Sequence, residues 1–268
     1  MSDGTGSEVR GKPPPLGPGQ PTEESLPAGR VAAAYGVHLL TASGIVFLLL
    51  AAIEICRDAP RPAVVFLWFV AATITDAIDG PLARRFHVKR YAPSVDGRAI
   101  DDIVDYLGFT FLPLLLVWRM GWVPGGPDVA WLWIAPALVA SLFGFANLLA
   151  KDEAGGFFRG FPSYWNILTI YLGLAFEAWG EAGRWVNAGL LLFFAGLTVA
   201  PVWFVYPNLA PRRWRPIVLG GAFLWLAAML AMLPFYPGRV PGWATLATLV
   251  YPAIYIVISL YLRRSPAH

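Results

Sequence analysis

Long apolar segments constrain this chain of 268 residues more than any other feature. About eight of them follow one another with short polar connections, and each approaches the about 20 residues that a helix needs to cross a bilayer. A backbone in lipid must satisfy its own hydrogen bonds, which leaves helices because the pattern is not that of barrel strands. The sequence therefore predicts an all-α, polytopic membrane helix bundle. The expected transmembrane segments are residues 31–55, 62–84, 98–120, 129–150, 163–180, 185–206, 215–234 and 242–262.

The composition and organisation of the chain agree with this class. Hydrophobic residues make up 57% and charged residues 14% of the sequence, whereas soluble domains carry about 25% charged residues. The net charge of +3 gives no reason to expect a nucleic-acid partner. Residues 1–29 are rich in Pro, Gly and polar residues and cannot bury an apolar face. We therefore expect a disordered cytoplasmic tail at residues 1–29, followed by one transmembrane domain over residues 30–268.

The distribution of basic residues predicts the orientation. If both termini lie inside, thirteen Lys and Arg residues flank the spans on the inside and five on the outside. Basic residues accumulate in cytoplasmic connections. We therefore expect cytoplasmic N- and C-termini. Glu54 and Glu177 then lie toward the outside and are assigned no catalytic role.

Two pairs of aspartates interrupt the second and third expected segments near their inside ends. Asp76 and Asp79 are three residues apart, and Asp101 and Asp105 are four apart, so each pair shares one helix face. A carboxylate buried without a partner costs several kcal/mol, and clustered carboxylates repel one another unless cations intervene. A short inside connection between antiparallel helices would bring the two faces together. Oxygen ligands suit Mg²⁺ or Mn²⁺, and four carboxylates predict two ions.

Small and basic residues surround these aspartates. Gly80, Ala83 and Gly97 lack bulk, which would let a flat group such as a nucleobase approach the backbone. Arg84 could neutralise a diphosphate. For either glycine alone, helix packing is the better explanation. In combination with the aspartates, the pattern favours a site for a nucleoside diphosphate.

The string DAIDGPLARRFHVKRYAPSVDGRAIDDIVD, residues 76–105, resembles the signature of the CDP-alcohol phosphotransferase family. That signature is D-x-x-D-G-x-x-A-R, a spacer, and G-x-x-x-D-x-x-x-D. Here the spacer has 12 residues, 85–96, and is longer than in most of the family. The longer spacer is similar to that of the bacterial phosphatidylcholine synthases. VHLLTASG at residues 37–44 and GFPSYWN at residues 160–166 also resemble that subfamily.

The resemblance implies a reaction, a location and roles for residues. The implied reaction moves the phosphatidyl group of CDP-diacylglycerol to choline and releases CMP. It implies an active site on the cytoplasmic side of a bacterial inner membrane, Mn²⁺ or Mg²⁺ as cofactor, and a homodimer. Asp76, Asp79 and Asp101 would hold metal, with Asp105 as ligand and general base. The implied donor-binding residues are Thr41, Asp76, Gly80, Ala83, Arg84 and Gly97.

Four residues are interpreted from their own chemistry. Choline is a quaternary ammonium ion, which aromatic faces hold best, so Tyr164 and Trp165 are candidate choline ligands. The competing interpretation is that Trp and Tyr belong at membrane interfaces in any case. For Thr41, the alternative is a hydrogen bond back to its own helix. His38 is interpreted as structural.

Three other functions stay open at this stage. Another acceptor, such as serine, inositol phosphate or glycerol phosphate, would need added cations, which Lys89, Arg90 and Arg98 could supply. Membrane prenyltransferases also use aspartate pairs with Mg²⁺, but their pairs lie in well-separated loops and lack the Gly-x-x-Ala-Arg element. A cation-coupled transporter predicts charges in several spans near the midplane and inverted repeats. The acids here cluster on two adjacent segments at one face.

Overall fold

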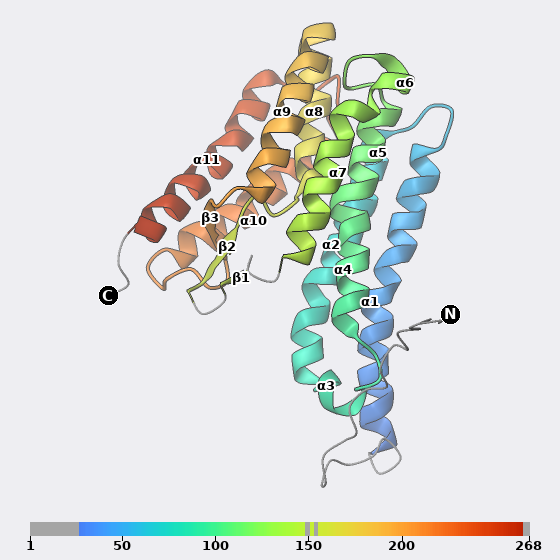
Figure 1. Cartoon of the computed structure of the whole chain (residues 1–268), viewed down its shortest axis with the longest axis vertical. Coiled ribbons are helices and arrows are strands. Elements are labelled where there is room, and N and C mark those ends of the chain that lie inside the picture. Colours follow the sequence, from blue (N-terminus) through green and yellow to red (C-terminus); the bar gives the residue numbers. More distant parts are fainter. Residues whose placement is uncertain (1–26, 148–150, 153–154, 265–268) are drawn as a thin grey trace, which may run out of the picture.

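The computed structural model describes residues 27–147, 151–152 and 155–264, and it is an elongated bundle of long helices (Figure 1). Helix α1 (Ala28–Ile55) and helix α2 (Pro62–Arg85) form an antiparallel hairpin, followed by the short α3 (Val88–Tyr91). Of the expected N-terminal tail, residues 1–26 lie outside the described residues. The other helical elements are α4 (Gly97–Asp105), the π-helix η2 (Tyr106–Phe111), α5 (Leu112–Arg119), α6 (Gly126–Val129), α7 (Trp131–Ala146), α8 (Trp165–Trp179), α9 (Glu181–Val199), α10 (Arg215–Met232), the 3-10 turn η3 (Leu233–Phe235) and α11 (Gly242–Arg264).

Six helices in the described part of the chain are long and apolar enough to cross a membrane. They are Ala28–Ile55, Pro62–Arg85, Gly126–Ala146, Glu181–Val199, Arg215–Phe235 and Gly242–Arg263. The third and fifth expected segments are helical but fall outside this set. The third carries Asp101, Asp102 and Asp105, and α8 has only 15 residues. The polytopic helical bundle is therefore confirmed, whereas the count of eight spans and the sides of the termini stay predictions.

A small antiparallel sheet was not expected from the sequence. Strands β1 (Lys151–Asp152), β2 (Phe157–Arg159) and β3 (Trp203–Val205) pair in that order. The prediction of a helix over residues 185–206 was wrong at its end, because α9 stops at Val199. Pro201 follows, and a residue before proline avoids the helical region; Ala200 is accordingly extended, with ψ of 149°.

The helices pack around one large apolar core. Helix α1 packs along α2, α7 along α9, and α8 along both α5 and α9. Small residues such as Ala51 and Ala137 are fully buried between them, which fits helix packing in membranes, where close approach replaces the hydrophobic effect. On the outer side, α10 and α11 carry large exposed apolar side chains, among them Phe223 at 76% and Trp243 at 73% exposure. A continuous surface of that kind is expected to face lipid.

The hairpin of α1 and α2 has two different ends (Figure 1). Its turn, residues 56–61, lies at the upper end of the bundle in the view shown. The connection from α2 through α3 to α4 lies at the opposite end. The predicted functional aspartates belong to α2 and α4, the two helices that this lower connection joins.

Candidate active site

Three aspartates come together where α4 packs beside α2. Asp76 of α2 and Asp101 and Asp105 of α4 each offer one carboxylate oxygen, and these three oxygens lie within 4.8 Å of one another. Asp96 fixes the start of α4, because its carboxylate accepts hydrogen bonds from the backbone of Arg98 and Ala99 at 3.1 and 3.2 Å. Directly after Asp105 the chain continues as the π-helix η2, a local form that is frequent at functional sites.

The acidic triad, Asp76, Asp101 and Asp105, has the chemistry of a metal site. All three donors are carboxylate oxygens, the ligands that Mg²⁺ and Mn²⁺ prefer. Within the described residues, no Lys or Arg forms an ion pair with Asp76 or Asp105. The neighbouring Asp102 differs, because it lies 3.7 Å from Nε of Arg98. The triad could therefore hold a metal ion, and it fits the expected oxygen-bound cation.

Asp79 does not join the triad. Its side chain is buried and lines a second cavity, together with Asp101. Asp101 borders both this cavity and the one that contains Asp76 and Asp105. The structure thus brings three of the four predicted metal ligands into one group and places Asp79 in the second cavity. The second of the two expected ions, and Asp79 as a metal ligand, stay predictions.

The second cavity collects most of the predicted donor-binding residues, and we call it the donor cavity. It has a volume of about 580 Å³, and its lining includes Thr41, Asp79, Gly80, Ala83 and Gly97. The Thr41 hydroxyl donates to the carbonyl of Val37 at 3.3 Å, which is a hydrogen bond back to its own helix. It nevertheless faces the cavity.

Arg84 and Asp76 do not line the donor cavity. Arg84 is exposed and lies beside Gly80. A Cβ added at Gly80 would lie 3.7 Å from Nη1 of Arg84. Asp76 belongs to the first cavity. These two predicted donor-binding residues are therefore not part of the lining of the donor cavity.

The long spacer forms one wall of the donor cavity. Residues 88, 89 and 92–96 all line it. The spacer is held against α1 by two contacts: Arg30 Nη1 donates to the Tyr91 hydroxyl at 2.6 Å, and the hydroxyls of Tyr35 and Ser94 lie 2.7 Å apart. The hydrogen bond from Arg30 also lowers the pKa of Tyr91. The extra length that set this sequence apart from most of the resembled family is thus an ordered part of the cavity.

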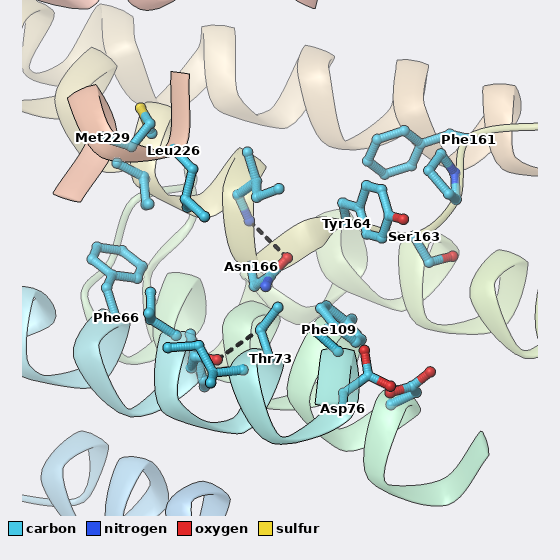
Figure 2. A pocket seen from close by; sticks show the side chains of 18 of the residues that line it. Phe66, Thr73, Asp76, Phe109, Phe161, Ser163, Tyr164, Asn166, Leu226 and Met229 are labelled. Atoms are coloured by element: carbon cyan, nitrogen blue, oxygen red, sulfur yellow. Dashed lines mark hydrogen bonds between the residues drawn. The ribbon is translucent and has the colours of Figure 1, made fainter. Parts of the chain in front are cut away.

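The first cavity extends from the triad toward α10 and has a volume of about 530 Å³. We call it the acceptor cavity. Figure 2 shows Asp76 and Phe109 at one end and Phe66 and Met229 at the other. Its lining is mostly apolar and aromatic. It includes Phe158 of β2 and Tyr206, which follows β3.

Sequence reasoning missed Phe109, Phe158 and Tyr206. Phe158 and Tyr206 lie 5.0 Å apart between ring centroids, brought together by the pairing of β2 with β3. The only signal for them was the aromatic content of the two segments, FFRGF and WFVY, on either side of the bundle helices α8 and α9. Phe109 follows Asp105 by four residues and so lies on the same helical face.

Tyr164 and Trp165, the two predicted choline ligands, point to different places. Tyr164 lines the acceptor cavity, with its ring centroid 5.8 Å from that of Phe109. Trp165 is fully buried, and its indole N–H donates to the Ser141 hydroxyl at 2.7 Å. Ser163 reaches the same hydroxyl at 3.1 Å. The geometry therefore supports Tyr164 as a cavity residue and assigns Trp165 to anchoring α8 on α7.

A glycine makes this arrangement of α8 possible. Gly160 has a φ of +82°, and a Cβ there would collide with the carbonyl oxygen of Thr198. Its backbone N–H donates to the carbonyl of Val202 at 2.6 Å. Only glycine combines this left-handed conformation with so close an approach. The turn before α8, with Tyr164 at its end, is therefore fixed against the end of α9.

Comparison with known proteins gives a consistent result. No protein-family model matches the chain. The chain is 31% identical over 221 residues to phosphatidylcholine synthase of Pseudomonas aeruginosa, a match that covers 82% of this chain and 88% of that protein. It is 35% identical over 232 residues to phosphatidylcholine synthase of Bradyrhizobium diazoefficiens, covering 85% and 80%. For the protein of the same name from Legionella pneumophila the values are 31% over 239 residues, covering 85% and 88%.

Proposed function

Because the chain belongs to the phosphatidylcholine synthase family, we propose that it transfers the phosphatidyl group of CDP-diacylglycerol to choline and releases CMP. The observation that carries the proposal is the acidic triad. Three carboxylate oxygens lie within 4.8 Å of one another at the boundary of two cavities. In this proposal the donor cavity binds the nucleotide, and the acceptor cavity binds choline.

The CDP part of the donor would occupy the donor cavity. Gly80, Ala83 and Gly97 leave room for the nucleotide against the backbone. Its diphosphate would reach the border formed by Asp101, with Arg84 close to Gly80 on the exposed side. A divalent cation held by Asp76, Asp101 and Asp105 would neutralise charge on the diphosphate and on the departing CMP. The two acyl chains would remain in the bilayer.

Asp105 is the proposed general base. A choline hydroxyl is a poor nucleophile at neutral pH and needs its proton removed as it attacks. The hydroxyl oxygen would form a bond to the phosphorus that carries the diacylglycerol group. The bond from that phosphorus to the oxygen of CMP would break, and the hydroxyl proton would pass to Asp105. This carboxylate borders the acceptor cavity, from which choline would approach.

The trimethylammonium group of choline would lie against aromatic faces of the acceptor cavity. Tyr164 and Phe109 lie beside the triad, and Phe158 and Tyr206 add two further rings in the same lining. Aromatic faces attract quaternary ammonium ions. An anionic acceptor such as inositol phosphate would instead call for basic side chains, and Arg159 is the basic residue of this lining.

Location and assembly are proposed from the sequence. The excess of basic residues on the inner side supports an active site on the cytoplasmic face of a bacterial inner membrane. The resemblance to CDP-alcohol phosphotransferases supports a homodimer. Two ions of Mn²⁺ or Mg²⁺ are expected, one at the triad and one at Asp79.

A comparison of acceptors tests the proposed function. Purified protein in detergent would be supplied with CDP-diacylglycerol and Mn²⁺, and CMP release would be measured with choline, serine, inositol phosphate and glycerol 3-phosphate. We expect release that depends on choline. Release only with another acceptor would keep the reaction class and refute choline. No release with any of the four, from folded protein, would refute the reaction class.

A further inference from the structure

His38 occupies an unexpected position beside the donor cavity. It lies on α1, three residues before Thr41, and both side chains face that cavity. The His38 side chain is only 7% exposed. Its Nε2 is buried and has no hydrogen-bond partner among the described residues. The sequence alone favoured a structural role for this residue, and the structure gives a reason to revise it.

The imidazole ring packs directly on the backbone of Gly97. A Cβ at residue 97 would lie 2.5 Å from Cε1 and 2.7 Å from Nδ1 of His38, which is too close for any side chain. Gly97 is also the first residue of α4 and a position of the family signature. The glycine therefore makes room for the ring, and the ring fixes how closely α4 approaches α1.

Packing alone does not explain a histidine at this place. A buried nitrogen without a hydrogen-bond partner destabilises the fold, and an apolar side chain would fill the same space without that cost. Buried polar atoms are nearly always hydrogen-bonded. The partner of Nε2 is therefore expected in the cavity that the ring lines, where Asp79, Asp101 and Lys89 also lie.

We infer that His38 binds the CDP moiety of the donor, with Nε2 hydrogen-bonded to an acceptor atom of the nucleotide in the donor cavity. This inference rests on the proposed function and names a further residue for the same site. Cytosine, ribose and diphosphate all offer such atoms. The ring, Thr41 and Gly97 then form one side of the nucleotide site, and the spacer residues 92–96 form the other.

Two substitutions separate nucleotide binding from packing. His38→Leu keeps an apolar side chain of similar reach and removes the nitrogen, whereas His38→Gln keeps a polar group that can hydrogen-bond. His87→Asn is the matched control, because His87 is exposed and its left-handed backbone suits asparagine. Each purified protein is tested for the rise in unfolding temperature caused by CDP, and for KM with CDP-diacylglycerol and with choline.

We expect His38→Leu to raise KM for CDP-diacylglycerol about tenfold, the effect of one lost hydrogen bond, with KM for choline unchanged. The stabilisation by CDP should shrink in parallel, His38→Gln should recover part of it, and His87→Asn should match the wild type. If His38→Leu binds CDP as the wild type does, the imidazole serves packing only and the inference is wrong.

A double substitution at the contact strengthens the test. Gly97→Ala should lower the unfolding temperature because its Cβ meets the imidazole, and adding His38→Ala should restore that temperature. We expect CDP stabilisation to stay weak in the double variant. Full recovery of CDP stabilisation would overturn the inference. Since CDP binding is measured without choline, a wild type that binds CDP through His38 but shows no choline-dependent CMP release would refute the proposed function alone.

Discussion

The two ends of the α1–α2 hairpin differ in the partners that they give to their carboxylates. At one end, Glu54 is only 3% exposed and accepts hydrogen bonds from Nε and Nη2 of Arg61 at 2.8 and 2.9 Å. Arg57 adds a second cation, with Nε 3.0 Å from the same carboxylate. The hydrogen bond to Glu54 raises the pKa of Arg61, so this cation is permanent. At the other end, Asp76 and Asp105 have no such arginine among the described residues.

The difference separates a structural site from a functional one. A carboxylate that is paired with arginines helps to hold the turn between two helices. Its oxygens already accept hydrogen bonds from those arginines and are not free to bind a metal ion. A carboxylate without them can bind an exchangeable cation and accept a proton during a reaction. The comparison therefore predicts that changes at the triad abolish catalysis and spare the fold, whereas changes at Glu54 do the reverse.

The largest expected effect is that of Asp105→Asn. This change removes the proposed base and a metal ligand while keeping the shape of the side chain. We expect choline-dependent CMP release to fall by about 100-fold or more, with the unfolding temperature little changed. Asp102→Asn is the control, because Asp102 is the neighbouring acid that pairs with Arg98. Equal losses in the two variants would contradict a special role of Asp105.

Removal of metal should have a comparable effect that is reversible. Chelation with EDTA is expected to abolish CMP release, and added Mn²⁺ or Mg²⁺ should restore it, because the triad has no protein cation to replace the ion. The fold at the Glu54 end should be indifferent to the chelator. Activity that persists after exhaustive chelation would refute the metal-dependent account of the triad.

An intermediate effect is expected at the acceptor cavity. Tyr164→Leu removes an aromatic face beside the triad, and a cation–π contact is worth about 0.5–2 kcal/mol. KM for choline should therefore rise about 2- to 30-fold, while KM for CDP-diacylglycerol stays the same. Tyr164→Phe keeps the ring and should remain close to the wild type. An unchanged KM for choline in Tyr164→Leu would remove this residue from the choline site.

The smallest effect on catalysis is expected from Glu54→Gln. The change leaves Arg57 and Arg61 without their anion, so the unfolding temperature should fall by several degrees. KM for both substrates should remain unchanged, because Glu54 is in the last turn of α1, beside residues 56–61, whereas the triad belongs to α2 and α4. Glu54→Asp, which keeps the charge, should lose less stability. A selective loss of activity in Glu54→Gln would erase the distinction between the two ends.

The helical segments and the triad follow from local rules, so the sequence predicted them well. Long apolar segments become helices in lipid, and i, i+4 spacing places Asp101 and Asp105 on one face. Asp79 shows where the rule stops. A residue three positions on is rotated by about 60° around the helix axis, and this rotation turns Asp79 from the triad toward the donor cavity.

The aromatic lining depended on tertiary structure and could not be predicted. Strands of two and three residues are too short to show a period-two pattern, so the contact between Phe158 and Tyr206 had no local signature. Tyr164 and Trp165 are neighbours in sequence, and a helix rotates successive residues by about 100°. The indole of Trp165 donates a hydrogen bond to Ser141 of another helix. This contact from outside α8 decides that Tyr164, and not Trp165, lines the cavity.

The central claim is that the triad binds the cation on which the reaction depends. The most direct measurement is binding of Mn²⁺ to purified protein, followed by the electron paramagnetic resonance signal of free Mn²⁺, alongside choline-dependent CMP release in the same samples. We predict that wild type and Glu54→Gln bind Mn²⁺ and release CMP in proportion to occupancy, and that Asp76→Asn binds less Mn²⁺ and loses CMP release. Undiminished Mn²⁺ binding and CMP release in Asp76→Asn would contradict the account.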